Sequence, residues 1–415
     1  MKNIIVTCFF VLMQLGILVH AQTNTTTDIY LKSQDGYACF RIPAIVKSKA
    51  GTLLAFAEAR KNSCSDTGNI DLVVKRSEDG GKTWSRIITV WDDGDNVCGN
   101  PSPIVDQETG RIILVSCWNL GEDHEKQIID KTSKDSRRVY VLYSDNDGKS
   151  WSTPKEITSS VKHPDWTWYA TGPCHGIQLQ GKKNKGRLVV AANHMVAGTK
   201  TYHSQLIYSD DKGETWKLGG IVNEHGGNES SVVELKNGYL MLNMRNYNRE
   251  ESKTRSYAIS KDGGETVSQM SYLPELIEPI CQGSTLNYMK KGKISNNILF
   301  SNPASTDKRE KMTIKLSENN GKTWPYAYQV YSGPSAYSDL TNLRNGNIGL
   351  LYEYGINNPY EKIGFIIIPF EQLKKYNKWY DSTYANYCLT LKAHETKDYF
   401  DSHWGIITFL HTSRK

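Results

Sequence analysis

Five copies of one eight-residue pattern constrain this chain more than any other feature. Each copy has Ser first, Asp or Asn third, Gly fifth and Thr or Ser seventh; the copies are SEDGGKTW, SDNDGKSW, SDDKGETW, SKDGGETV and SENNGKTW, starting at residues 77, 144, 209, 260 and 317. Alternating, strand-like segments flank every copy, which predicts a hairpin turn whose Asp and Ser side chains bond to backbone amides and whose Gly takes a positive φ. Because turn chemistry explains these boxes, we expect Asp79 and Asp211 to be structural rather than catalytic.

The spacing of the boxes predicts the architecture. The copies start 60 residues apart on average, close to the length of a four-stranded propeller blade with its loops. Residues 22–372 leave room for about six such units. The sequence therefore predicts an all-β fold, a six-bladed β-propeller over residues 22–372, followed by a short C-terminal extension over residues 373–415 that carries no box and has a short helix at FEQLKKY. In a propeller the innermost strands converge on one axis, so residues far apart in the chain can meet in one pocket.

The start of the chain and its net charge suggest where the protein is located and which partners it binds. Residues 1–21 have the pattern of a signal peptide, with Lys2, an apolar stretch from Ile4 to Val19, and a cleavage point after Ala21. No later segment is apolar enough to span a membrane. We therefore expect an exported protein, periplasmic or extracellular, and a monomer. The net charge of +6 comes without a basic stripe, which disfavours nucleic acid as a partner.

Seven cysteines follow the predicted leader, at positions 39, 64, 98, 117, 174, 281 and 388. They are widely spaced and contain no CxxC pair, so they fit neither a metal site nor a dense disulfide framework. We expect most of them to be buried as small apolar residues, with at least one thiol unpaired. No metal or other cofactor is expected.

Three arginines stand in motifs that suit the binding of one carboxylate. They are Arg41 in CFRIPAIV, Arg245 in LMLNMRNY and Arg309 in SNPASTDKR. A guanidinium is charged at any working pH and pairs bidentately with a carboxylate, so three of them in one pocket would favour a planar anion over a neutral sugar. Any one of them taken singly could equally be a solvated residue or an ion-pair partner.

FRIPAIV together with the five boxes resembles the exo-α-sialidase (neuraminidase) family of retaining glycoside hydrolases, over about residues 28–372. The resemblance implies a sialidase-type propeller that hydrolyses terminal sialic acid from sialylated glycans through a covalent tyrosyl intermediate. It makes sialic acid the ligand of the arginines. It further implies roles for six residues: acid/base for Asp66 in CSDTGN, nucleophile for Tyr337 in SAYSDL, activating carboxylate for Glu229 in NESS, orientation of Arg41 for Glu353 in LLYEYG, and sugar contacts for Arg60 in AEAR and Tyr169 in WYATGPCHG.

Elementary chemistry explains these residue types. Sialic acid carries a carboxylate on its anomeric carbon, which would repel the Asp or Glu nucleophile of most retaining glycosidases. A neutral Tyr337 avoids that repulsion, and Glu229 can take its proton. Asp66 must enter protonated, so we expect burial or neighbouring anions to raise its pKa and to give a mildly acidic optimum.

Several alternatives stay open at this stage. Asp71 is a second carboxylate near Asp66, although it falls inside a predicted strand. Arg60 could be anchored by Glu58 or Asp71, and Tyr169 could pack inside a blade. The fold would also suit a trans-sialidase, an intramolecular trans-sialidase or a non-catalytic sialic-acid-binding propeller; the last predicts the loss of a catalytic residue.

Overall fold

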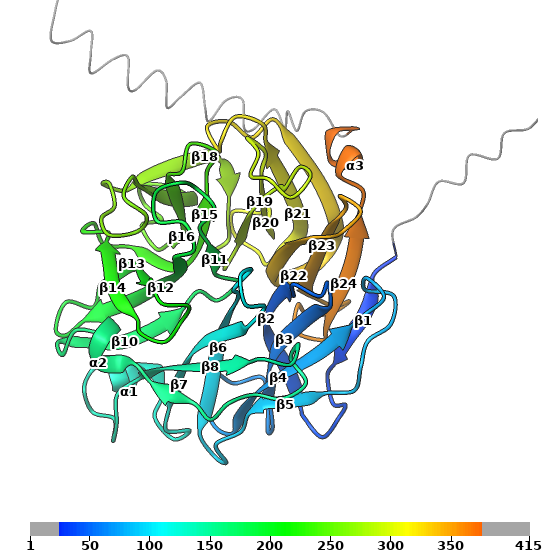
Figure 1. Cartoon of the computed structure of the whole chain (residues 1–415). Coiled ribbons are helices and arrows are strands. Elements are labelled where there is room, and N and C mark those ends of the chain that lie inside the picture. The colour runs from blue at the N-terminus through cyan, green and yellow to red at the C-terminus, as the bar shows by residue number, and fades with distance from the viewer. Residues whose placement is uncertain (1–24, 376–415) are drawn as a thin grey trace, which may run out of the picture.

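The computed structural model describes residues 25–375, and the chain within these bounds is almost entirely β (Figure 1). The predicted signal peptide and nearly all of the predicted C-terminal extension lie outside the described residues. Three short helices accompany the strands: α1 (Glu125–Ile129), α2 (Thr158–Val161) and α3 (Phe370–Lys375). Helix α3 confirms the helix expected at FEQLKKY. The all-β expectation is thus confirmed.

The strands form four hydrogen-bonded sheets. The first contains β2 (Cys39–Lys47), β3 (Leu53–Arg60), β4 (Ile70–Ser77), β5 (Ile88–Trp91), β6 (Val97–Val105), β7 (Ile112–Asn119), β8 (Arg138–Ser144) and β9 (Lys155–Glu156). The second contains β10 (Trp166–Thr171), β11 (Ile177–Gln178), β12 (Leu188–Val196), β13 (Tyr202–Ser209) and β14 (Lys217–Ile221). The third contains β15 (Gly227–Glu234), β16 (Leu240–Asn246), β17 (Thr254–Ser260) and β18 (Ser271–Ile277).

The fourth sheet joins the two ends of the described chain. It contains β19 (Ser284–Asn287), β20 (Ile298–Pro303), β21 (Glu310–Ser317), β22 (Tyr326–Asn342), β23 (Ile348–Tyr354), β24 (Lys362–Ile368) and β1 (Thr27–Leu31). Strand β1 pairs antiparallel with β24. The 17-residue β22 pairs with β21 along its first part and with β23 along its second part. One parallel bridge, Ile70 to Val97, connects the two halves of the first sheet.

Successive strands therefore follow one another in antiparallel groups, and the sheets lie around a common centre (Figure 1). Strand β2 contacts β6 and β22, β6 contacts β10, and β15 contacts β12 and β19. Separate clusters of buried apolar side chains fill the spaces between neighbouring groups. One of these clusters contains Tyr30, Phe40, Ala55, Ala57 and Phe365.

The five boxes form the hairpin turns that their sequences predict. They connect β4 to β5, β8 to β9, β13 to β14, β17 to β18 and β21 to β22. In the first, Asp79 accepts hydrogen bonds from Ser77 Oγ, Thr83 N and Thr83 Oγ1 at 2.6–3.0 Å, and Gly81 N donates to Ser77 Oγ. Asp211 and Asp262 repeat the pattern. Their carboxylates are consumed by the turn, as expected for structural residues.

Candidate active site

Tyr337 on β22 lies at the centre of the three predicted arginines. The guanidinium carbons of Arg41 and Arg309 lie 5.1 and 5.6 Å from its ring centroid, and Arg245 Nη1 donates to its hydroxyl at 3.2 Å. These side chains come from β2, β16 and the turn before β21. The structure therefore brings together residues that are up to 296 positions apart in the sequence.

Arg41 is paired with a buried glutamate. Arg41 makes a two-point ion pair with Glu353, with Nε and Nη2 at 2.8 and 3.3 Å from the two carboxylate oxygens. Glu353 is fully buried and also accepts from the backbone N–H groups of Ile42 and Tyr337. This buried pair fixes the direction of the Arg41 fork and leaves its Nη1 without a hydrogen bond among residues 25–375. Glu353 thus has the geometry of the predicted orienting carboxylate.

Arg245 belongs to a second pair that includes the predicted base. Its Nη1 donates to Glu229 Oε2 at 2.6 Å, and the other oxygen, Glu229 Oε1, accepts the Tyr337 hydroxyl at 2.6 Å. Burial and the negative charge of Glu229 raise the pKa of Tyr337 well above its usual value, against the opposing charges of Arg245 and Arg309. Tyr337 is therefore neutral in this state, with a carboxylate in place to accept its proton.

Arg309 makes no ion pair with a carboxylate among the described residues. Its Nη1 donates to the hydroxyl of Tyr360 at 2.9 Å and its Nη2 to the carbonyl of Ile280 at 3.2 Å. The ring of Tyr360 also lies 4.0 Å from the Arg41 guanidinium carbon. Tyr360 thus bridges two cations that would otherwise repel each other, and the sequence analysis did not identify it because nothing in the turn INNPYEK marks it.

Two β-branched residues beside these arginines have left-handed backbone conformations. Ile42 has a φ of 57° and Ile280 a φ of 54°. Such conformations are costly for a β-branched residue and persist where the surrounding structure imposes them. Here they direct Ile42 N toward Glu353 and the Ile280 carbonyl toward Arg309, so the strain serves the placement of both arginines.

Asp66 lies on the loop between β3 and β4 and is held by Arg60. Arg60 Nη1 lies 2.7 Å from Asp66 Oδ1, while Arg60 Nη2 lies 2.6 Å from Glu58 Oε2. The side chain of Asp66 is largely exposed. Desolvation by the surrounding protein alone would raise its pKa, but the charges of Arg60, Arg41 and Arg137 outweigh that effect and lower the pKa. The expectation of a raised pKa is therefore wrong for this state, because the neighbours of Asp66 are cations rather than anions. Arg60 is held by Glu58, the alternative that the sequence left open, and also contacts Asp66.

Asp71, the rival of Asp66, points to a different environment. It accepts a 2.6 Å hydrogen bond from the Tyr37 hydroxyl, and its side chain is buried on β4. Burial, with the nearby Asp92 carboxylate, raises its pKa to about 6. None of its hydrogen bonds reaches Tyr337 or the arginines, whereas Asp66 pairs with Arg60.

Tyr169 is fully buried in an apolar cluster that includes Trp166 and Trp216. Its ring lies 6.3 Å from that of Trp166 in a stacked arrangement. The structure therefore shows the packing role that the sequence left open, and Tyr169 offers no exposed face to a sugar.

Cys174, four residues after Ala170, is buried with a φ of 144°, which is a conformation that glycine adopts more readily.

Three further side chains, Tyr247, Tyr202 and Glu125, form a connected series beside Arg245 that the sequence did not predict. Arg245 Nη2 donates to the hydroxyl of Tyr247 at 2.8 Å, the Tyr247 ring lies 5.1 Å from that of Tyr202, and the Tyr202 hydroxyl donates to Glu125 at 2.5 Å. Desolvation and the charges of Asp66 and Glu229 raise the pKa of Glu125, against Arg137. Glu125 comes from α1, a short helix inserted between β7 and β8, which carries no motif that sequence reasoning could use.

Two of the cysteines form a disulfide, Cys39–Cys64. Cys98, Cys117, Cys174 and Cys281 are free and buried, as expected for most of the set; Cys388 lies outside the described residues. The disulfide was not predicted, because a 25-residue separation says nothing about spatial proximity when the two residues belong to a strand and a neighbouring loop.

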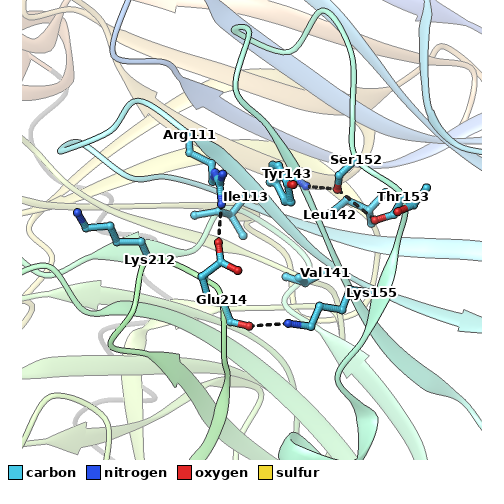
Figure 2. A pocket seen from close by; sticks show the side chains of 11 residues that line it. Arg111, Ile113, Val141, Leu142, Tyr143, Ser152, Thr153, Lys155, Lys212 and Glu214 are labelled. Carbon is cyan, nitrogen blue, oxygen red and sulfur yellow. Dashed lines mark hydrogen bonds and ion pairs between the residues drawn. The ribbon is translucent and has the colours of Figure 1, made fainter.

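A surface hollow elsewhere on the molecule has a different character. Figure 2 shows it between the box turn that contains Lys212 and the strands β7 and β8, lined by Arg111, Tyr143, Lys155 and Glu214. Arg111 Nη1 pairs with the Glu214 carboxylate at 2.7 Å, and Lys155 Nζ donates to the Glu214 backbone carbonyl at 2.9 Å. None of the candidate catalytic residues lines this hollow.

Two features are absent from residues 25–375. No helix there has the length and apolarity needed to cross a membrane. No three or more His, Cys, Asp or Glu side chains in the same range are grouped as ligands of a metal ion.

Comparisons with known proteins agree with the geometry. A family profile described as a BNR repeat-like domain matches residues 51–350. A sialidase of Bacteroides fragilis is 33% identical over 78% of this chain and 61% of its own length. An exo-alpha-sialidase of Arthroderma benhamiae is 28% identical over 80% of this chain and 81% of its own length.

Among solved structures, the Hadza microbial sialidase Hz136 has a TM-score of 0.74 and 30% identity, over 84% of this chain and 69% of that one. The leech intramolecular trans-sialidase has a TM-score of 0.70 at 21% identity, which supports a shared fold. The chain spans 61% of the Bacteroides fragilis sialidase and 55% of the Micromonospora viridifaciens sialidase.

Proposed function

Because the chain belongs to the sialidase family, whose BNR repeat-like domain accounts for most of it, we propose that it is an exo-α-sialidase. It removes terminal sialic acid from glycoproteins, glycolipids or oligosaccharides, with retention of configuration. The observation that carries the proposal is the hydrogen-bonded triad of Tyr337, Glu229 and Arg245, surrounded by Arg41 and Arg309.

Substrate binding would begin with the carboxylate of sialic acid. Arg309 has no carboxylate partner among residues 25–375, and Arg41 Nη1 makes no hydrogen bond there. These unused donors suit a planar anion, and its charge would offset the repulsion between the guanidinium groups. Binding would place the anomeric carbon near the Tyr337 hydroxyl.

In the first chemical step, Tyr337 Oη forms a bond to the anomeric carbon while its proton passes to Glu229 Oε1. The neutral phenol avoids repulsion from the substrate carboxylate, and Arg245 stabilises the charge that develops on Oη. Asp66 donates a proton to the glycan oxygen as the bond between that oxygen and the anomeric carbon breaks. In the second step Asp66 takes a proton from water, the water oxygen bonds to the anomeric carbon, the bond to Tyr337 Oη breaks, and Glu229 returns the proton to Oη. Asp66 can donate only after its ion pair with Arg60 opens and its carboxyl is protonated.

The finer architecture is part of the same proposal: a six-bladed β-propeller. Three observations support it: the antiparallel strands can be divided into five groups of four and one of five (β10–β14), with the long β22 shared by two groups; the N-terminal β1 completes the group of β22–β24; and six apolar clusters each join neighbouring groups. A propeller closed by its first strand would place β2, β15 and β22 around one axis. A low-resolution scattering envelope of a closed disc would test this.

We propose export on the leader pattern alone, and a monomeric working state. N-terminal sequencing of protein recovered outside the cytoplasm should start at Gln22, and light scattering should return one chain's mass, 46.9 kDa less the leader.

The decisive test is incubation of purified protein with 3′- and 6′-sialyllactose, followed by NMR. Release of α-configured sialic acid at early times supports retaining hydrolysis. A first product with inverted configuration, or no product from either isomer, contradicts it. Addition of lactose distinguishes hydrolysis from transfer, and a 2,7-anhydro product would indicate the intramolecular reaction.

A further inference from the structure

The Cys39–Cys64 disulfide joins the two halves of the candidate site. Cys39 begins β2, two residues before Arg41, and Cys64 lies on the loop after β3, two residues before Asp66. One covalent link therefore connects the strand that carries a carboxylate-binding arginine to the loop that carries the proposed acid.

The loop has little else to hold it. Its outward residues are exposed, and the Asp66 side chain is 75% exposed. Ser65 bonds only to Ser63 and Thr67 within the loop, and Gly68 N donates to the Gly121 carbonyl at 2.8 Å at the far end. Among the described residues, the segment from Lys61 to Thr67 is also held at its start, where Lys61 N donates to the Asn69 carbonyl at 3.0 Å. At its centre Arg60 donates to the Cys64 carbonyl at 2.6 Å and pairs with Asp66.

The Arg60 contact cannot position the acid during turnover. An ion pair with an exposed carboxylate holds weakly, and Asp66 must leave it to become protonated. At that moment two restraints remain beside Asp66, the disulfide and the hydrogen bond from Arg60 to the Cys64 carbonyl, and only the disulfide is covalent. A general acid that is misplaced by about 1 Å loses much of its effect, whereas a leaving group that departs as a stable anion needs no such acid.

We propose that the Cys39–Cys64 disulfide is a positioning element for proton donation by Asp66, so that its reduction selectively slows cleavage of sialosides with poor leaving groups. The inference rests on the proposed sialidase function. Reduction by dithiothreitol transfers two electrons and two protons to the disulfide, giving two thiols and the cyclic disulfide of the reagent.

The experiment compares kcat/KM for 3′-sialyllactose and for 4-nitrophenyl sialoside. It uses the oxidised protein, the protein treated with dithiothreitol, and the double variant Cys39→Ser/Cys64→Ser. We expect a loss of about tenfold or more for sialyllactose, a fraction of the 10²–10⁴ that a general acid contributes, and a change below about twofold for the nitrophenyl substrate. The double variant should match the reduced protein and be insensitive to dithiothreitol.

A cycle with Asp66→Ala tests whether the link acts through the acid. In that background reduction should cause no further loss with sialyllactose, because the group being positioned is absent. Equal losses with both substrates, accompanied by a lower Tm, would assign the disulfide a stabilising role only. A persistent effect in Asp66→Ala, or no effect of reduction in the parent, would also overturn the proposal. If the oxidised protein cleaves neither substrate, the sialidase function itself fails, and the inference with it.

Discussion

Replacing Arg41 by Ala and replacing Arg309 by Ala should have different consequences, although both residues face the same ring. Arg41 neutralises Glu353, whose side chain has no exposed surface. Removal of one partner of a buried ion pair costs about 3–5 kcal/mol. Because Glu353 keeps the N–H groups of Ile42 and Tyr337 as donors, we expect the lower end of that range.

The expected loss in the free energy of unfolding can be measured as a shift in Tm. At roughly 2.1 cal/mol/K per residue, about 350 described residues give an unfolding entropy of about 0.7 kcal/mol/K, so a loss of 3–5 kcal/mol lowers Tm by about 4–7 °C. Arg309 has no carboxylate partner among residues 25–375, so Arg309→Ala should change the free energy of unfolding by less than about 1 kcal/mol. Its loss should instead remove about 2–3 kcal/mol of binding to the substrate carboxylate, a fall in kcat/KM of roughly 30- to 150-fold.

Differential scanning calorimetry and sialyllactose kinetics on the two variants test this division. The matched control is Arg41→Ala with Glu353→Gln, which removes the orphaned charge and should recover part of the stability without recovering activity. Equal Tm losses for Arg41→Ala and Arg309→Ala would refute the assignment of a structural pair to one arginine and a free cation to the other. Full activity in Arg309→Ala would refute its role in binding.

Three other substitutions test separate parts of the reasoning. Tyr337→Phe removes the nucleophilic oxygen and should abolish retaining hydrolysis with Tm nearly unchanged. In the parent protein, a covalent adduct trapped by a fluorinated sialosyl fluoride should map to Tyr337 by mass spectrometry, and a label on Asp66 would contradict the assignment of Tyr337 as nucleophile. Asp211→Ala breaks the hydrogen bonds of one box turn, so the free energy of unfolding should fall by about 1 kcal/mol while kcat per folded molecule stays the same; a large fall in kcat at constant Tm would refute a purely structural box. Burial tends to lower the pKa of His175, but the charge of Asp339 and its 2.7 Å contact with His175 Nδ1 raise that pKa overall. The stability that His175 supplies is therefore complete below its unfolded pKa of about 6.5 and is lost as pH rises through the higher folded pKa. Tm measured against pH should show this decline in the parent protein and not in His175→Gln.

The sequence predicted the parts of the structure that depend on local chemistry. A box such as residues 77–84 contains its own donors and acceptors, so the turn around Asp79 follows from eight residues. The placement of Arg41, Glu229 and Tyr337 followed from motifs and from the expectation that blades share an axis. The disulfide, Tyr360 and Glu125 escaped because each depends on which loops lie side by side once the sheets have packed.

The Asp66 pKa shows why a correct residue can be assigned the wrong electrostatics. From the sequence we expected burial or neighbouring anions to raise the pKa of Asp66. In the structure Arg60 lies one strand residue before the loop and points back at Asp66, and the lowered pKa follows from that contact. In the free enzyme the alkaline limb of kcat/KM, which reports the acid in its protonated form, should therefore lie at lower pH than for an unpaired carboxyl. Arg60→Gln removes the charge and leaves a shorter, neutral polar side chain, and it should move this limb to higher pH for sialyllactose. With 4-nitrophenyl sialoside, whose cleavage needs no proton from Asp66, the limb should not move; a matching shift with both substrates would mean that a different group controls it.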